Sequence, residues 1–259
     1  MLKSEWMSVF RSRINASLIH FGISALIAAL AAILVLGVWF PYPYREVSGG
    51  SELFFLIVTV DLILGPLLTF VVFNRLKPRK ELIRDLSTIA IIQLAALAYG
   101  LHTVYLARPI YLVHEVDRFK VVTLAEIDLE DLPKALPQFR SIPLYGIETI
   151  GVRRSRSNEE MFSSINSALA GKDVSAMPAR WQPLDDANRA QIRRVAKEVD
   201  FLRSRAKDGG KEMDDLINSV GLIPADVIAL PLMSHRDDWS VLLDRRDLRI
   251  IGYVPIDGF

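Results

Sequence analysis

The sequence predicts a membrane protein in which a bundle of three transmembrane helices is followed by an α+β domain. Two observations lead to this fold class. Residues 1–106 consist largely of long uncharged apolar stretches, with only nine basic and six acidic residues, whereas residues 107–259 carry 22 basic and 24 acidic residues in short mixed segments. A helix needs about 20 apolar residues to cross the ~30 Å hydrocarbon layer of a membrane, and three stretches meet that length. We therefore expect two domains, which meet between residues 106 and 107.

The three apolar stretches are residues 14–40, 53–73 and 86–106. The first and the third contain no charged side chain, and the second contains one, Asp61. Buried helices of soluble proteins seldom hold such long uninterrupted runs. The first stretch is also longer than the ~7–15 apolar residues of a cleaved signal peptide. We expect all three to be retained membrane helices in contact with lipid.

The basic residues of the short connecting segments predict the orientation of these helices. Lysine and arginine are enriched in the cytoplasmic loops of membrane proteins. Three basic residues precede the first helix and five lie in residues 74–85, whereas residues 41–52 contain only Arg45. We therefore expect the N-terminus and the 74–85 loop in the cytoplasm, and residues 107–259 on the opposite side.

Five polar side chains within the predicted helices are candidate functional residues, because polar groups cost free energy in lipid. The helical rise of ~1.5 Å per residue places them in two layers. Asp61, Tyr99 and His102 form the outer layer, and His20 and Gln93 form the inner layer, nearer the cytoplasm. Two interpretations stay open: the side chains form hydrogen bonds that join the helices, or they bind a partner or handle a proton.

Periodicity and turn residues predict the elements of the second domain. Strands are expected over residues 109–116, 118–122, 142–152, 227–231, 239–243 and 250–254. Helices are expected over residues 158–170, 187–207 and 211–220, a loop or short helix over 129–135, and loops over 172–183 and 234–238. This mixture predicts an α+β domain that is large enough for its own hydrophobic core.

No catalytic motif stands out in the second domain. The sequence has no cysteine, no glycine-rich phosphate loop, and neither the HExxH nor the GxSxG motif. His114 and His235 each lack a second imidazole at metal-ligand spacing. Basic runs are balanced by nearby acidic residues, which disfavours nucleic acid as a partner. We expect no metal and no cofactor.

Several strings in the first half resemble those of one protein family. They are WFP at residues 39–41, VDLILGPLLT at 60–69, QLAALAYG at 93–100, ARP at 107–109 and DRF at 117–119. These strings, all within residues 1–125, are similar to those of the TfpX/TfpZ family of type IV pilin accessory proteins. The resemblance implies a non-enzymatic protein of the bacterial inner membrane with a periplasmic α+β domain. It also implies an association with the major type IV pilin that modulates the stability of the pilin or its assembly into pili.

The pilin partner that the resemblance implies has a single apolar helix, with a glutamate near its mature N-terminus on the cytoplasmic side. At that depth this chain offers the imidazole of His20 and the amide of Gln93 as hydrogen-bond donors. Ser24, Ala28 and Ala32 continue the face of His20 outward, and small residues allow another helix to approach closely. We therefore expect the pilin helix to lie along the first helix, and the periplasmic domain to contact the pilin head.

An alternative from a different class stays open. Asp61, Tyr99 and His102 are also the residue types of a small membrane enzyme or a proton-coupled component. The substitution Asp61→Asn separates the two hypotheses, because it would abolish proton chemistry but largely preserve a hydrogen-bonding role.

Overall fold

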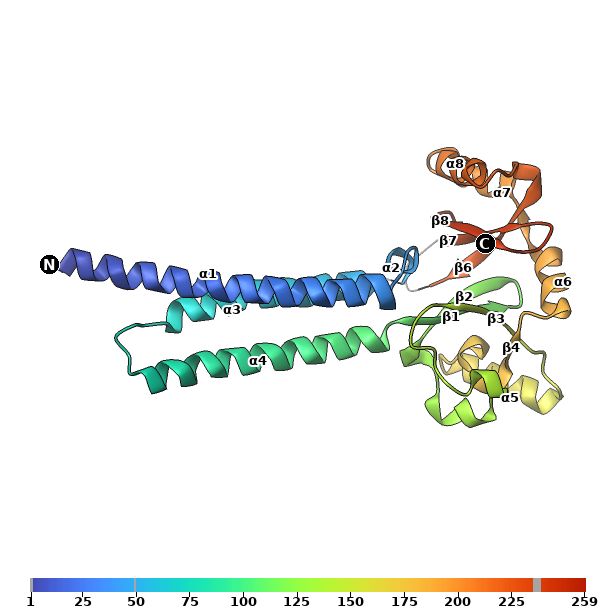
Figure 1. Ribbon diagram of the computed structural model, residues 1–259. Coiled ribbons are helices and arrows are strands. Elements are labelled where there is room, and N and C mark those ends of the chain that lie inside the picture. The colour runs from blue at the N-terminus through green and yellow to red at the C-terminus, as the bar shows by residue number, and fades with distance from the viewer. Residues whose placement is uncertain (1, 49, 235–238) are drawn as a thin grey trace. The chain divides into compact units, whose positions relative to one another are not determined.

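A computed structural model describes residues 2–48, 50–234 and 239–259 (Figure 1). The chain divides into two compact units. One, which we call the helical unit, comprises Met1–Pro41 and Gly50–Leu106. The other, the sheet unit, comprises Tyr42–Gly49 and Ala107–Phe259.

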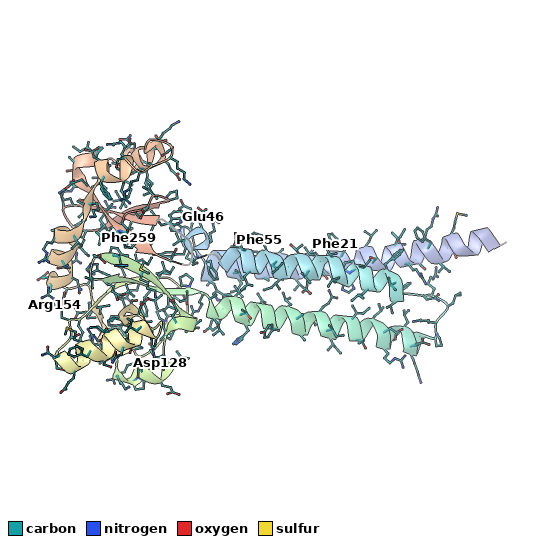
Figure 2. All side chains as sticks on the ribbon, turned by 180° about the vertical axis from the view of Figure 1, so that it is seen from behind. Phe21, Glu46, Phe55, Asp128, Arg154 and Phe259 are labelled. Carbon is teal, nitrogen blue, oxygen red and sulfur yellow. The ribbon has the colours of Figure 1, made fainter. Side chains whose placement is uncertain are left out.

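The helical unit contains three helices that are long and apolar enough to cross a membrane. They are α1 (Leu2–Leu34), which continues into the π-helical turn η1 (Val35–Trp39), α3 (Gly50–Val72) and α4 (Arg79–Leu106). Large apolar side chains cover their outer surfaces, and Figure 2 shows Phe21 and Phe55 pointing away from the helices. The predicted membrane bundle is confirmed.

Glycines set the close approach of α3 to α4. A Cβ atom at Gly65 would lie 2.1 Å from Nε2 of Gln93, and one at Gly100 would lie 2.7 Å from Cγ2 of Ile57. A larger residue at either position would require the side chain of Gln93 or Ile57 to move. These two contacts fix which turn of α3 lies beside which turn of α4.

The sheet unit is built on a mixed eight-stranded sheet in its described part. The strands are β1 (Pro109–Glu115), β2 (Arg118–Thr123), β3 (Glu148–Val152), β4 (Trp181–Pro183), β5 (Lys197–Glu198), β6 (Val227–Met233), β7 (Trp239–Asp244) and β8 (Ile250–Val254). Their order is β4-β3-β1-β2-β6-β7-β8, and β5 pairs with β6 outside this path. β1 runs parallel to β3, and β2 runs parallel to β6, whereas the other pairs are antiparallel. The predicted α+β class is confirmed.

Short helices connect these strands. The α-helices are α2 (Tyr44–Val47), α5 (Asn158–Leu169), α6 (Asp186–Val195), α7 (Val199–Arg203) and α8 (Lys211–Ser219). The 3₁₀ turns are η2 (Leu124–Glu126), η3 (Leu129–Lys134), η4 (Pro137–Phe139), η5 (Val174–Ala176), η6 (Pro178–Arg180) and η7 (Pro224–Asp226). Ser157 begins α5 as an N-cap that accepts a hydrogen bond from the backbone N–H of Glu160, so the predicted start of this helix is confirmed.

The segment between α1 and α3 is part of the sheet unit, which the sequence did not predict. Tyr44 and Val47 are buried in the main core cluster of the sheet. The hydroxyl of Tyr44 lies 2.6 Å from the hydroxyl of Tyr253 on β8, and Ser234 Oγ donates to the carbonyl of Val47 at 2.8 Å. α2 is therefore an element of the sheet unit's core.

The prediction of one helix over residues 187–207 is wrong. α6 ends at Val195, and Ala196 adopts an extended conformation that leads into β5. Lys197 and Glu198 pair with β6 before α7 begins. The apolar spacing misled the prediction because Ile192 and Leu202 are both buried, although they lie on different helices.

Two further boundaries also differ from the prediction. The strand expected over 142–152 covers only its last five residues, β3, and the carbonyls of Pro143 and Leu144 instead accept hydrogen bonds from the guanidinium of Arg108. The loop expected over 172–183 contains η5, η6 and β4, because buried Trp181 donates its indole N–H to the carbonyl of Ser175. Residues 235–238 of the predicted 234–238 turn, which include His235, lie outside the described residues.

Candidate functional site

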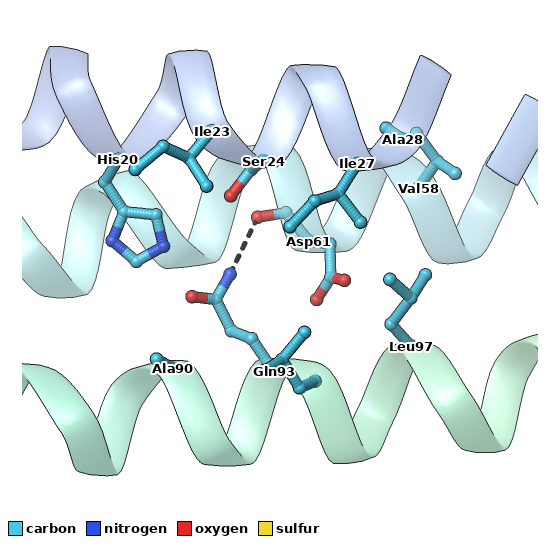
Figure 3. Close-up of a pocket in the computed structure, with 11 residues that line it drawn as sticks. His20, Ile23, Ser24, Ile27, Ala28, Val58, Asp61, Ala90, Gln93 and Leu97 are labelled. Atoms are coloured by element: carbon cyan, nitrogen blue, oxygen red, sulfur yellow. Dashed lines mark hydrogen bonds between the residues drawn. The ribbon is translucent and has the colours of Figure 1, made fainter. Parts of the chain in front are cut away.

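A cavity of about 150 Å³ lies within the helical unit, between α1 and α4 (Figure 3). α3 forms its third side and contributes Asp61. The lining residues are His20, Ile23, Ser24, Ile27, Ala28, Val58, Asp61, Ala90, Gln93, Leu94 and Leu97. The cavity therefore brings together the predicted candidates of α1, His20, Ser24 and Ala28, with Asp61 and Gln93.

Single hydrogen bonds join the helices around this cavity. Nδ1 of His20 lies 2.6 Å from Oγ1 of Thr69 on α3, and Ser17 Oγ donates to the carbonyl of Pro66 at 2.7 Å. Gln93 Nε2 donates to the backbone carbonyl of Asp61 at 3.2 Å, which Figure 3 marks with a dashed line. Thr69 is a partner that the sequence analysis missed. Its only sequence signal is its spacing of eight residues, just over two helical turns, from Asp61 on the same helix.

Two hydrogen-bond acceptors of the cavity have no donor among the described residues. Oε1 of Gln93 is buried without a partner. The carboxylate of Asp61 points into the cavity, and no described residue forms a hydrogen bond or an ion pair with it. A buried acceptor that stays unpaired costs about 1–3 kcal/mol, and a charged carboxylate within a membrane costs about 2.5–3.5 kcal/mol. These groups are therefore suited to a ligand that supplies donors.

Tyr99 and His102 do not lie beside Asp61, and the predicted outer layer is wrong. Tyr99 is 76% exposed, His102 is exposed, and neither lines the cavity. Tyr99 follows Gln93 by six residues, and the helical rotation of 100° per residue turns it away from the face of Gln93. Gln93 lies against Gly65, one helical turn after Asp61, and bonds the backbone carbonyl of Asp61 rather than its carboxylate. The three residues of the enzyme alternative are therefore not assembled.

Two histidines of the sheet unit, His114 and His235, were considered as metal ligands in the sequence. No group of three histidine, cysteine, aspartate or glutamate side chains among the described residues could hold a metal ion. His114 is instead a buried residue of β1, and His235 lies outside the described residues.

Comparisons with known proteins relate the whole chain to one family. Residues 8–49 match the family described as fimbrial assembly protein FimB. The fimbrial assembly protein of Dichelobacter nodosus serogroup I is 38% identical over 254 residues, and that of serogroup E1 is 36% identical over 255 residues. Each match covers 97% of this chain and 97% of the relative. The protein of serogroups C1 and C2 is 44% identical over 127 residues, which is 49% of this chain and 95% of that relative. No solved structure matches the chain. Because two relatives match over nearly their full length, the chain belongs to the fimbrial assembly protein FimB family.

Proposed function

We propose that this protein is a non-enzymatic accessory protein of the bacterial inner membrane. It binds the transmembrane helix of the major type IV pilin and modulates the stability of the pilin or its assembly into pili. The names of the relatives, fimbrial assembly proteins, support a role in fimbrial assembly. The strings that resemble pilin accessory proteins support the pilin as the partner.

The cavity between α1 and α4 carries this proposal. Its walls combine the small side chains Ser24 and Ala28 with the polar groups of His20, Asp61 and Gln93. Small residues allow a further helix to approach closely in lipid, where packing and hydrogen bonds drive association. A pilin helix that lies along α1 would cover the cavity and place its own polar group among these side chains.

The side chains of His20 and Gln93 fit the neutral form of a glutamic acid. In the tautomer of His20 whose Nδ1 accepts from the hydroxyl of Thr69, Nε2 carries the proton and donates. The carbonyl of a protonated carboxyl group accepts from Nε2, and its O–H donates to the unpaired Oε1 of Gln93. Such an acid avoids the cost of a charge in lipid. The cavity would therefore recognise the glutamate near the mature N-terminus of the pilin.

The proposal includes an orientation. The N-terminus and the 74–85 loop lie in the cytoplasm, and the sheet unit lies in the periplasm, where it reaches the pilin head. The distribution of basic residues supports this orientation, with five in the 74–85 loop against Arg45 alone in residues 41–52.

Site-specific photocrosslinking in cells that also express the pilin tests the proposal. A photoreactive residue at Ala28, which lines the cavity, should crosslink to the pilin. The same residue at Leu26 is the matched control, because Leu26 lies two residues away on the same helix and is exposed on its outer face. His20→Leu should weaken the crosslink from position 28. Equal crosslinks from both positions, or crosslinks that arise only from the sheet unit, would contradict binding in the cavity.

A further inference from the structure

A larger cleft of about 800 Å³ lies within the sheet unit. It is located at the carboxyl ends of the parallel neighbours β1 and β3. Glu115 ends β1 and Val116 follows it, whereas Val152 ends β3 and residues 153–155 follow it. α5 and α6 line its sides. Ligands of sheets with parallel strands commonly bind at the carboxyl ends of the strands, so this is a position where a binding site is expected.

Two of the four arginines in this cleft are occupied by internal contacts. Nη1 and Nη2 of Arg153 donate to the two carboxylate oxygens of Glu160, at 3.0 and 2.6 Å. Arg180 is buried and donates to Ser155, Ser164 and the carbonyl of Arg153. These arginines hold the wall of the cleft together and leave little capacity for a ligand.

The other two arginines are free to bind a ligand. Arg154 and Arg194 are exposed, and no described residue forms a hydrogen bond or an ion pair with either guanidinium. Two acidic residues, Glu115 and Asp185, also line the cleft, and Asp185 is engaged as the N-cap of α6. The two free guanidinium groups therefore outnumber the one remaining carboxylate, that of Glu115. Because a guanidinium pairs with a carboxylate through two parallel hydrogen bonds, the free groups favour an acidic ligand.

The side of the cleft formed by α5 is apolar. Met161, Ile165 and Ala168 lie on one face of α5 and line the cleft. Met161 is 42% exposed and Ile165 is 49% exposed, and no residue of α5 is buried. An amphipathic helix normally buries its apolar face, so this face is suited to apolar side chains of a partner.

His114 adds an unpaired polar group to the lining of the cleft. The side chain is 2% exposed, and neither ring nitrogen has a hydrogen-bond partner. Burial lowers the pKa of His114 to about 4, so the imidazole is neutral near pH 7 and offers one donor and one acceptor. Buried polar groups of folded proteins are almost always paired, and a ligand in the cleft would supply the partner.

We propose that this cleft binds an acidic peptide segment of a protein partner. Apolar side chains of the segment pack on Met161 and Ile165, its carboxylates pair with Arg154 and Arg194, and one of its polar groups bonds His114. This site is separate from the cavity of the helical unit, so either proposal can fail without the other.

Fluorescence polarisation with the full-length protein in mild detergent tests the proposal. The probe is a labelled eight-residue peptide that alternates leucine with aspartate, and the control peptide has asparagine in place of each aspartate. The aspartate peptide should bind at least tenfold more tightly than the control peptide. The double variant Arg154→Glu/Arg194→Glu should weaken its binding at least tenfold, and so should Ile165→Asp.

Matched variants separate the cleft from the general surface. Arg156→Glu reverses an exposed charge two residues from Arg154, and Leu169→Asp introduces a charge on α5, yet neither residue lines the cleft. Both should leave binding within twofold of the parent protein. If the cleft variants fail to fold, raising NaCl from 50 to 500 mM should still weaken binding to the parent protein severalfold. Equal binding of the two peptides, or equal losses in the cleft and control variants, would overturn the proposal.

Discussion

The helical unit and the sheet unit pair their polar groups in different ways. In the helical unit the contacts between helices carry single hydrogen bonds, such as that of His20 with Thr69, and the carboxylate of Asp61 has no partner among the described residues. In the sheet unit the carboxylate of Glu160 accepts from the guanidinium of Arg153 and from the backbone N–H of Arg156, and these bonds lower its pKa to about 2. In lipid there is no water to replace a missing hydrogen-bond partner, whereas water at the surface of the sheet unit can take that place. An unpaired group such as Oε1 of Gln93 is therefore the stronger sign of a binding site when it lies in the helical unit.

The largest expected effect concerns the orientation of the chain in the membrane. The difference between the two units depends on lipid around the helical unit and water around the sheet unit. Alkaline phosphatase folds to its active form only in the periplasm. The enzyme should be active when it is fused after Phe259 and inactive when it is fused after Lys80, and colony staining with immunoblots of the fusions would measure both. An inactive but stable C-terminal fusion would reverse the proposed orientation.

The close contact of α3 with α4 gives the next largest effect. Gly65→Leu would drive a side chain into Gln93, and overpacking of this kind costs about 1–3 kcal/mol. We expect a lower thermal unfolding midpoint in detergent. Gly22→Leu is the control, because a Cβ atom at Gly22 has no neighbour within 4 Å. The second substitution Gln93→Ala should restore part of the midpoint that Gly65→Leu loses, since it removes the atoms that clash.

A different result would change the description of the helical unit. If Gly65→Leu and Gly22→Leu lower the midpoint equally, the loss reflects leucine in a membrane helix and the close contact at Gly65 is absent. If Gln93→Ala does not restore stability, Gln93 is not the neighbour of Gly65.

The sequence predicted those features of both units that depend on local pattern. Apolar length predicted the membrane helices, and segments rich in Val, Ile and Tyr predicted the strands β1 and β2 that meet near Asp117. It did not predict the relative rotation and offset of α3 and α4, which place Gln93 beside Asp61 and turn Tyr99 outward. The rotation and the offset depend on contacts between helices at single glycines. The depth of a residue along its own helix gives no information about such contacts.

Contacts between segments that are distant in the sequence also explain the wrong predictions in the sheet unit. The break of the predicted 187–207 helix depends on pairing of Lys197 with β6, a contact between distant segments. The inclusion of Tyr44 in the core depends on its contact with Tyr253, 209 residues later. The candidate site was partly predicted because polar residues in an apolar helix are conspicuous, but their partners, such as Thr69, were not.

The buried imidazole of the sheet unit predicts a moderate dependence of stability on pH. The pKa of His114 is about 4 in the folded state, compared with about 6.5 in an unfolded chain. Between these values the unfolded state binds more protons, so the free energy of unfolding falls as the pH is lowered. From pH 7.5 to pH 5 the loss is about 2 kcal/mol. Urea unfolding of the full-length protein in detergent, followed by tryptophan fluorescence at both pH values, would measure it.

The variant His114→Phe isolates this contribution. Phenylalanine does not titrate, so the variant should lose about 2 kcal/mol less stability than the parent protein over the same pH range. The carboxyl groups of Glu160 and Asp244 have pKa values lowered to about 2, so their contributions to the free energy of unfolding are lost at lower pH than this range. They therefore do not obscure the comparison of the variant with the parent protein. An unchanged pH dependence in the variant would mean that His114 is not buried in its neutral form.

The smallest effect concerns the segment that passes from the helical unit into the core of the sheet unit. Burial raises the pKa values of Tyr44 and Tyr253, whose hydroxyl groups share one hydrogen bond. Tyr44→Phe leaves the hydroxyl of the half-buried Tyr253 without this partner, which should lower the free energy of unfolding by about 1 kcal/mol. Tyr44→Phe/Tyr253→Phe removes both hydroxyl groups, and its stability should be closer to that of the parent protein than the sum of the single variants predicts.

Tyr42→Phe is the control, because the side chain of Tyr42 is exposed in the same segment. Strictly additive losses in urea unfolding would mean that the two hydroxyl groups do not interact.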